Sequence, residues 1–107
     1  MEDRKKYDVI ISEQAATMLE GHAAFLSKVS QKAAERFIRS FVVAAKSLED
    51  MPERCPWINL PYIPFRRYKK LVLCNRYMIV FSLCDRTVYI SYVIDTRQEY
   101  QWILSNE

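Results

Sequence analysis

The sequence predicts an α+β domain: a short N-terminal strand, a helical hairpin, a three-stranded antiparallel meander and a short C-terminal helix. Three observations favour this order. Apolar residues recur at helical spacing over residues 15–48, all four prolines lie between residues 52 and 64, and three apolar, β-rich runs follow them. Helices followed by strands are typical of a hairpin packed on one face of an antiparallel sheet.

Length and composition indicate one globular unit. A chain of 107 residues supports a single hydrophobic core, so we expect one domain over residues 1–107. Half of the residues are hydrophobic and 27% are charged, which is typical of a folded protein. No stretch approaches the roughly 18 apolar residues of a membrane span, and the N-terminus lacks the apolar segment of a signal peptide. We therefore expect a cytoplasmic protein that does not enter a membrane.

The N-terminal half contains a short strand and two helices. Residues 7–11 (Tyr-Asp-Val-Ile-Ile) form a β-rich run that stops at Ser12, a good helix N-cap. Helical periodicity then continues to about Lys28. Ser30 caps a second helix, whose apolar stripe extends to Leu48. Because the linker between the two helices is so short, we expect a hairpin.

The proline-rich segment, residues 52–64, predicts an extended loop without regular structure, held to the core by Trp57 and Tyr62.

Three strands and a helix follow. Turns at Asn75-Arg76 and Asp85-Arg86 join the strands into a meander, and the middle strand is apolar on both faces. The N-terminal strand lies at an edge or beside a meander strand, and its partner stays open. The strands are expected at residues 65–73, 77–83 and 88–94, and the helix at 98–104.

The cysteines and the histidine argue against disulfide and metal chemistry. An odd number of cysteines without Cys-x-x-Cys spacing predicts neither a disulfide framework nor a zinc site, so Cys55, Cys74 and Cys84 are interpreted as structural thiols, following the burial habit of free cysteine. His22 is the only histidine. It lies on the apolar stripe of the first helix, where a role in packing is favoured over a role as a general base. We expect no metal and no cofactor.

Five basic residues fall within one short stretch, residues 66–76, with Arg86 and Arg97 further on, in a chain whose formal charge is only +3. Such a stripe suits RNA, DNA or an acidic protein segment. It also suits a solvated hairpin edge that discourages aggregation, and the two interpretations stay open. The residues are Arg66, Arg67, Lys69, Lys70, Arg76, Arg86 and Arg97.

The order of elements and several short sequence segments resemble the RelE/ParE family of bacterial toxins from toxin–antitoxin pairs. The matching segments cover nearly the whole chain: Tyr-Lys-Lys-Leu at residues 68–71, Arg-Tyr-Met-Ile-Val-Phe at 76–81 and Val-Ile-Asp-Thr-Arg-Gln-Glu-Tyr at 93–100. The motif is mostly hydrophobic alternation, so its order and spacing carry more weight than any one piece.

The resemblance implies two activities. RelE-like members cleave messenger RNA on the ribosome without a metal, by attack of a ribose 2′-OH on the adjacent phosphate. ParE-like members bind DNA gyrase and carry out no chemistry. We expect a metal-free, ribosome-dependent endoribonuclease. The alternatives are a noncatalytic gyrase inhibitor and a degenerate member that only binds its antitoxin.

The resemblance also assigns candidate residues for cleavage. Arg97 stands where cleaving members place an arginine that contacts phosphate; alternatively it pairs with Asp95 or Glu99. Of Lys69 and Lys70, only one can point into a shared site, because strand side chains alternate between faces. Lys70 is favoured because it shares a face with Arg66 and Tyr68, although both lysines also suit a solvated edge. The catalytic candidates are Arg97, Lys70, Lys69 and Tyr100, and the RNA-binding candidates are Arg66, Arg67, Arg76 and Arg86.

Aromatic residues near the C-terminus complete this interpretation, and two departures weaken it. Tyr100 and Trp102 could stack on a base or anchor the final helix. The C-terminal region has no histidine, and Met78 occupies roughly the position of an arginine in some cleaving members. A lysine, Glu99 or Asp95 would then have to act as the general base.

The family implies one protein partner, an antitoxin that is small and often acidic. Apolar hairpin surface and the basic sheet edge would receive it. Operator DNA is bound through the antitoxin in such systems, so we assign no direct DNA binding to this chain.

Overall fold

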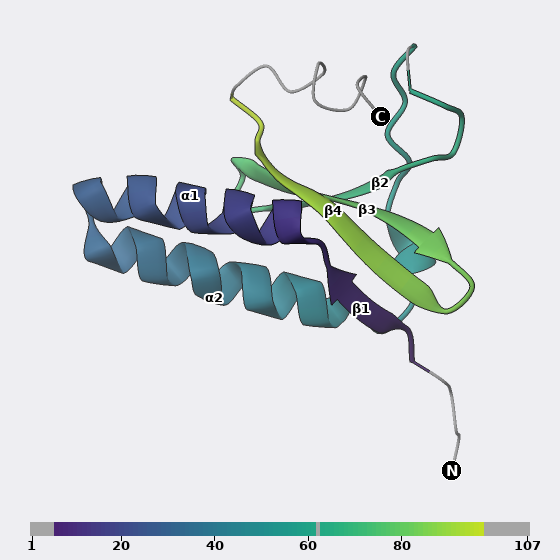
Figure 1. Cartoon of the computed structure of the whole chain (residues 1–107), viewed down its shortest axis with the longest axis horizontal. Coiled ribbons are helices and arrows are strands. Elements are labelled where there is room, and N and C mark those ends of the chain that lie inside the picture. Colours follow the sequence, from purple (N-terminus) through teal and green to yellow (C-terminus); the bar gives the residue numbers. More distant parts are fainter. Residues whose placement is uncertain (1–5, 62, 98–107) are drawn as a thin grey trace.

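The computed structural model describes residues 6–61 and 63–97, and it confirms the α+β class (Figure 1). The helical hairpin lies on one side of the sheet, and the segment before β2 lies on the other. The expected helix at residues 98–104 and the candidate Tyr100 lie outside the described residues. The elements are β1 (Asp8–Ile11), α1 (Glu13–Val29), α2 (Gln31–Ser47), a 3₁₀ turn η1 (Pro52–Arg54), β2 (Lys69–Leu73), β3 (Tyr77–Cys84) and β4 (Thr87–Asp95).

Two serines define the hairpin. The Ser12 hydroxyl accepts a hydrogen bond from the backbone N–H of Ala15 at 3.0 Å, and the Ser30 hydroxyl accepts one from Ala33 at 3.2 Å. Ser30 also ends α1, since its own N–H donates to the Leu26 carbonyl. Ser30 is therefore both the C-cap of α1 and the N-cap of α2. Because one residue separates the two helices, they form a tight hairpin.

The sheet has the order β1-β4-β3-β2, with β1 parallel to β4 and the other pairs antiparallel. The meander is confirmed, and the partner that the sequence left open is β4. The first meander strand begins at Lys69 rather than at Phe65. The prediction was wrong there because residues 64–67 form a turn: Arg66 has φ 56° and the Arg67 N–H donates to the Pro64 carbonyl at 3.2 Å.

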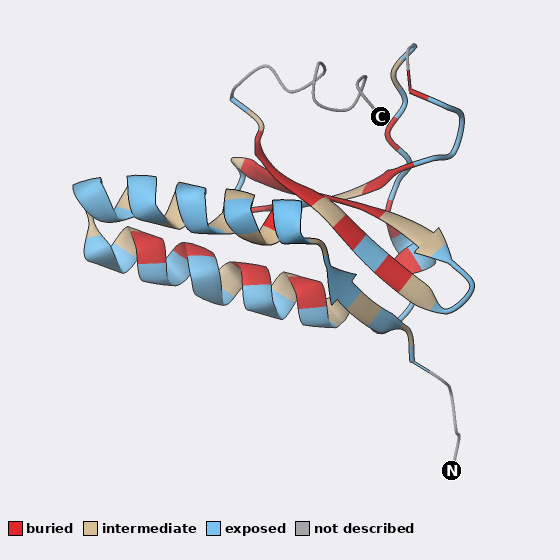
Figure 2. Cartoon of the chain, in the orientation of Figure 1, coloured by how far each residue is buried: buried red, intermediate tan, exposed pale blue. Residues whose placement is uncertain are grey.

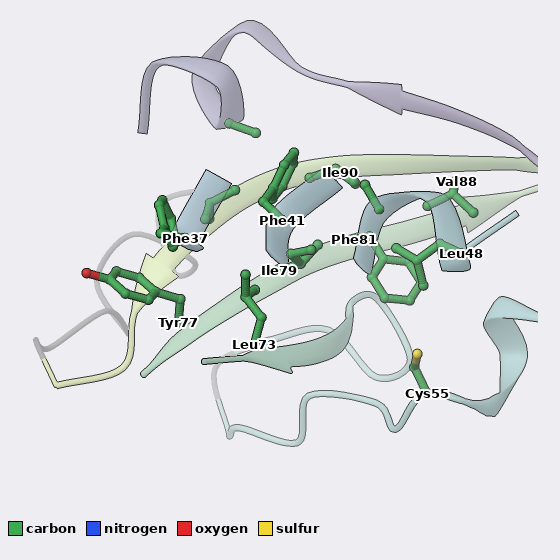
Figure 3. Packing of buried hydrophobic residues seen from close by; sticks show 13 residues of the cluster. Phe37, Phe41, Leu48, Cys55, Leu73, Tyr77, Ile79, Phe81, Val88 and Ile90 are labelled. Carbon is green, nitrogen blue, oxygen red and sulfur yellow. The ribbon is translucent and has the colours of Figure 1, made fainter. Parts of the chain in front are cut away.

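The core between the hairpin and the sheet is built by large side chains from α2 and the two central strands (Figures 2 and 3). Phe37, Phe41 and Leu48 meet Ile79 and Phe81 there. Every residue from Tyr77 to Phe81 is buried, so the prediction that the middle strand is covered on both faces is confirmed. Figure 3 also shows the Tyr77 hydroxyl at the margin of this core, pointing outward.

The opposite face of the sheet is covered by the proline-rich loop. Ile58 and Ile63 pack there with Tyr68, Val80 and Tyr92. Two backbone hydrogen bonds join the loop to β2 and the residue before it, from Ile58 N–H to the Tyr68 carbonyl and from Lys70 N–H to the Pro56 carbonyl. The loop is thus held chiefly by its isoleucines. The expected anchor Trp57 is 39% exposed, Tyr62 is outside the described residues, and η1 gives the loop a short helical turn that the sequence did not predict.

The cysteines differ in environment. Cys55 is buried, and burial raises the pKa of its thiol. Cys74 and Cys84 are exposed, so the expectation of burial is wrong for these two. Cys74 lies in the turn after β2 and Cys84 is the last residue of β3, where side chains project from the end of the sheet.

No helix in the described part of the chain is long and apolar enough to cross a membrane.

Candidate functional site

The sheet register divides the candidate cations into two groups at opposite ends of β2. Tyr77 pairs with both Leu73 and Asp95, which brings Arg76 and Arg97 to one end. Lys69 pairs with Phe81 instead. Lys70 lies three strand positions from Leu73, a distance of roughly 10 Å. The candidate cations therefore do not all lie at one end of the sheet. In an antiparallel meander, residues at the start of a strand and residues just after its end lie at opposite ends of the sheet.

Arg97 is bound to the carboxylate of Asp95. Its Nε and Nη2 donate to Asp95 Oδ1 and Oδ2 at 3.3 and 3.1 Å, and its backbone N–H donates to Oδ1 at 3.0 Å. Burial raises the pKa of Asp95, which is 7% exposed, but the hydrogen bonds from Arg97 outweigh it and hold that pKa below the usual value. The same hydrogen bonds raise the pKa of Arg97. Its side chain keeps 54% of its surface exposed.

Arg76 is held by its neighbours at the same end. Its carbonyl accepts hydrogen bonds from the N–H and hydroxyl of Thr96 at 2.7 and 2.9 Å. Its Nη2 donates to the Tyr77 hydroxyl at 3.2 Å, and the guanidinium carbon lies 5.4 Å from the centre of that ring. The Arg76 Nε atom is buried and has no hydrogen-bond acceptor.

Lys69 points into the protein, toward the face covered by the hairpin. Its ammonium donates to the Cys55 and Glu53 carbonyls at 2.5 and 3.2 Å and lies 4.1 Å from the centre of the Trp57 ring. Only 4% of the residue is exposed. Lys70 is half-buried and, by strand alternation, lies on the opposite face with Val80. Lys69 therefore holds the segment after η1 against the sheet.

The remaining basic candidates are exposed and lie over aromatic rings. Arg66 is 4.9 Å from the ring centre of Phe65, Arg67 is 5.3 Å from that of Tyr68, and Arg86 is 4.5 Å from that of Tyr7. The Tyr7 hydroxyl donates to Glu53 at 2.6 Å. This hydrogen bond raises the pKa of Tyr7 and lowers that of Glu53. This hydrogen bond joins Tyr7, the residue before β1, to η1.

His22 has the packing role that its position on α1 predicted. Its Nε2 lies 2.8 Å from the Val93 carbonyl, so that nitrogen carries the proton and donates. The ring contacts Phe37 edge-on, with 6.1 Å between centroids, and Tyr77 at 5.1 Å. This histidine connects the hairpin to the sheet.

A hollow of about 340 Å³ lies on α2, with Arg36, Arg39 and Val43 among its lining residues. Two others bear on the site. The hairpin groove, about 680 Å³, runs between α1 and α2 and exposes Ile38 and Val42. A smaller hollow of about 180 Å³, which we name the Arg36–Arg76 pocket, lies between the hairpin and the turn after β2. Sequence reasoning missed Arg36, because only the packing of α2 against that turn brings it near Arg76. The pocket is lined by Leu26, Ala33, Arg36, Phe37, Cys74, Arg76 and Tyr77.

Comparison with known proteins agrees with this architecture. A chain from a structure described as "Chromosomal ParDE TA system from P. aeruginosa" superposes with a TM-score of 0.66, covering 84% of this chain and 96% of that one. At 13% identity, the likeness concerns the fold. No curated protein matches the sequence. Residues 9–100 match the family described as "ParE toxin of type II toxin-antitoxin system, parDE", and the protein belongs to this family.

Proposed function

We propose that this toxin acts by binding DNA gyrase, as ParE-like proteins do, rather than by cleaving messenger RNA. The observation that carries the proposal is the separation of the candidate cations. Lys69 and Lys70 lie at one end of β2, and Arg76 and Arg97 lie beyond the other. The ribonuclease that the sequence favoured needs several of these groups around one phosphate.

The groups near Arg97 are poorly suited to the chemistry. RNA cleavage requires a base at the 2′-OH, cations for the developing phosphorane charge and an acid at the leaving oxygen. Asp95 already accepts three hydrogen bonds from Arg97, and its lowered pKa makes it a weak base. His22 and Lys69 are both occupied by backbone carbonyls inside the protein. Within the described residues, no group stands ready as a general base beside Arg97.

One observation favours the ribonuclease as a second candidate. More than half of the Arg97 side chain is exposed, and Arg76 is near enough to lower the pKa of Asp95. A phosphate could therefore meet two guanidinium groups at this end of the sheet. In that candidate, Arg97 and Tyr100 would act with Lys70 or Lys69, and Arg66, Arg67, Arg76 and Arg86 would hold the RNA.

A double variant, D95N/R97Q, separates the two candidates. It removes both charges and leaves an amide pair able to hydrogen-bond, so no buried carboxylate loses its partner. We expect the wild-type protein and the variant to inhibit DNA supercoiling by gyrase within about threefold of each other, a difference of less than about 1 kcal/mol. We also expect neither to cut a translated message, as mapped by primer extension on purified ribosomes.

Either of two results would overturn the gyrase assignment. Ribosome-dependent cuts by the wild-type protein that disappear in D95N/R97Q would establish the ribonuclease and place Arg97 in its site. Intact message together with undisturbed supercoiling would leave antitoxin binding as the activity of this chain.

The hairpin groove is the surface we assign to the antitoxin. Ile38 and Val42 are 38% and 56% exposed on α2, and a groove of this kind accepts the apolar face of an amphipathic helix. Arg39 and Glu35 both line the groove, so its apolar floor is bordered by charges of both signs, and Arg36 lies on α2 just outside it.

Val42→Asp is expected to weaken antitoxin binding at least about tenfold, because it places a charge where an apolar side chain would be desolvated. The matched control is Val43→Asp, at the next position of α2. Val43 is 66% exposed and lies outside the groove, so its replacement should change the affinity less than about twofold. Calorimetric titration with the cognate antitoxin measures both. Equal losses would place the antitoxin elsewhere.

A further inference from the structure

Two arginines and no carboxylate are among the described residues that line the Arg36–Arg76 pocket. Arg76 and Arg36 both line it, and neither forms an ion pair with another residue in the described part of the chain. The nearby carboxylate of Asp95 is already bound by Arg97 through both oxygens. Two cations thus share a small hollow in which the described residues provide the Tyr77 hydroxyl as an acceptor but no ion-paired carboxylate.

The Nε–H of Arg76 is a hydrogen-bond donor that lacks an acceptor. This donor is buried, while Nη2 of the same guanidinium donates to the Tyr77 hydroxyl. A buried charged donor without an acceptor costs free energy that an incoming acceptor would recover. Most buried polar atoms in folded proteins have a partner, so this atom marks a position where one is missing.

Two further donors belong to residues that line the same pocket. The Tyr77 hydroxyl accepts from Arg76, which leaves its own hydrogen free to donate. Arg36 contributes a second guanidinium from α2. Leu26, Ala33 and the Phe37 ring form apolar walls, which strengthen charged contacts by excluding water.

We propose that the Arg36–Arg76 pocket binds a single carboxylate, supplied by an aspartate or glutamate side chain of the antitoxin. The proposal deepens the antitoxin binding proposed above and rests on it. The pocket volume of about 180 Å³ equals roughly six water molecules, enough for one carboxylate head and too little for a nucleotide. The pocket also shares Arg36 and Phe37 with α2, the helix that forms one wall of the hairpin groove, so one partner could reach both.

Propionate, which reproduces the end of a glutamate side chain, is the probe for the pocket itself. In the ¹⁵N-labelled full chain, the Nε–Hε signal of Arg76 should shift saturably as propionate replaces chloride at constant ionic strength. Arg36→Gln should weaken this binding at least about tenfold, as expected when one of two charged partners is lost. Arg39→Gln removes the same charge one turn along α2, outside the pocket, and should change it less than about twofold.

Three results would overturn the proposal. A linear, unsaturable shift that chloride also produces would mean that no site exists. Equal losses from Arg36→Gln and Arg39→Gln would reduce the effect to net charge. Tighter saturation by inorganic phosphate than by propionate would assign the pocket to a phosphate group, as a nucleic acid carries.

The antitoxin itself provides the final step. Arg36→Gln should weaken its binding at least about tenfold, and replacing one acidic residue of the antitoxin by alanine should remove most of that difference in a double-mutant cycle. If every acidic residue of the antitoxin gives an additive cycle, the proposal fails. Supercoiling inhibition, measured without antitoxin, should not respond to Arg36→Gln, so failure of the pocket and failure of the gyrase assignment are seen separately.

Discussion

Phe81→Ala should lower the free energy of unfolding by about 3–5 kcal/mol, the usual cost of removing a buried phenylalanine. Phe81 is fully buried at the centre of β3, facing the hairpin near Leu48 (Figure 3), and pairs with Lys69 on one side and Ile90 on the other. The packed neighbours cannot collapse into the space, because the sheet fixes their backbones. A domain of this size has only about 5–15 kcal/mol of stability, so a large part of it would be lost.

Urea unfolding followed by circular dichroism measures the change. Tyr89→Ala is the control: Tyr89 is an aromatic residue on the neighbouring strand, but it is 41% exposed and should cost less than about 1.5 kcal/mol. A loss below about 1 kcal/mol for Phe81→Ala would contradict the packing described for this core. Added antitoxin should recover part of the stability, because it binds the folded state.

Lys69→Met should lower the free energy of unfolding by about 2–4 kcal/mol. The buried Cys55 carbonyl and the part-buried Glu53 carbonyl would lose their donor, and a buried acceptor left unpaired costs about 1–3 kcal/mol. Methionine keeps the length and apolar stem of lysine but donates no hydrogen bond to the Glu53 and Cys55 carbonyls. The contact of the ammonium with the Trp57 ring is lost as well. The segment after η1 should loosen first, which protease sensitivity near Trp57 would reveal.

Lys70→Met is the matched control, and it also tests the role that family resemblance suggested for this pair. Lys70 is half-buried on the other face of β2, and its replacement should cost less than about 1 kcal/mol. If Lys69→Met left stability unchanged but weakened binding to RNA or to ribosomes, the structural role of Lys69 would be wrong and a site role would replace it.

The helices were predictable because their signals are local. Ser12 and Ser30 cap the backbone within three residues of themselves, and a capping hydroxyl acts the same way in any tertiary context. The strand from residue 65 was predicted too long for a related reason. Its apolar and aromatic pattern ignores the turn at Pro64–Arg67, which depends on Arg66 adopting a left-handed conformation that is uncommon for arginine.

The candidate site was less predictable, since it depends on which distant residues meet. The sequence showed that basic residues surround the strand that begins at Lys69. It did not show that Lys69 would point inward to two carbonyls. For Arg97 it left open a phosphate role or a pairing with Asp95 or Glu99, and the structure shows the pairing with Asp95 at the surface. Family resemblance implied that Arg97 contacts phosphate. Its pairing with Asp95 depends on the path of the backbone just after β4.

The sequence by itself determined the α+β class, the hairpin, the meander and the packing role of His22, because periodicity, caps and prolines act over a few residues. Tertiary structure decided that β1 joins β4, that the cations divide between two ends of the sheet, and that Arg36 and Arg76 share a pocket. These outcomes depend on strand register and on how α2 packs, and both are set by burial of residues far apart in the chain.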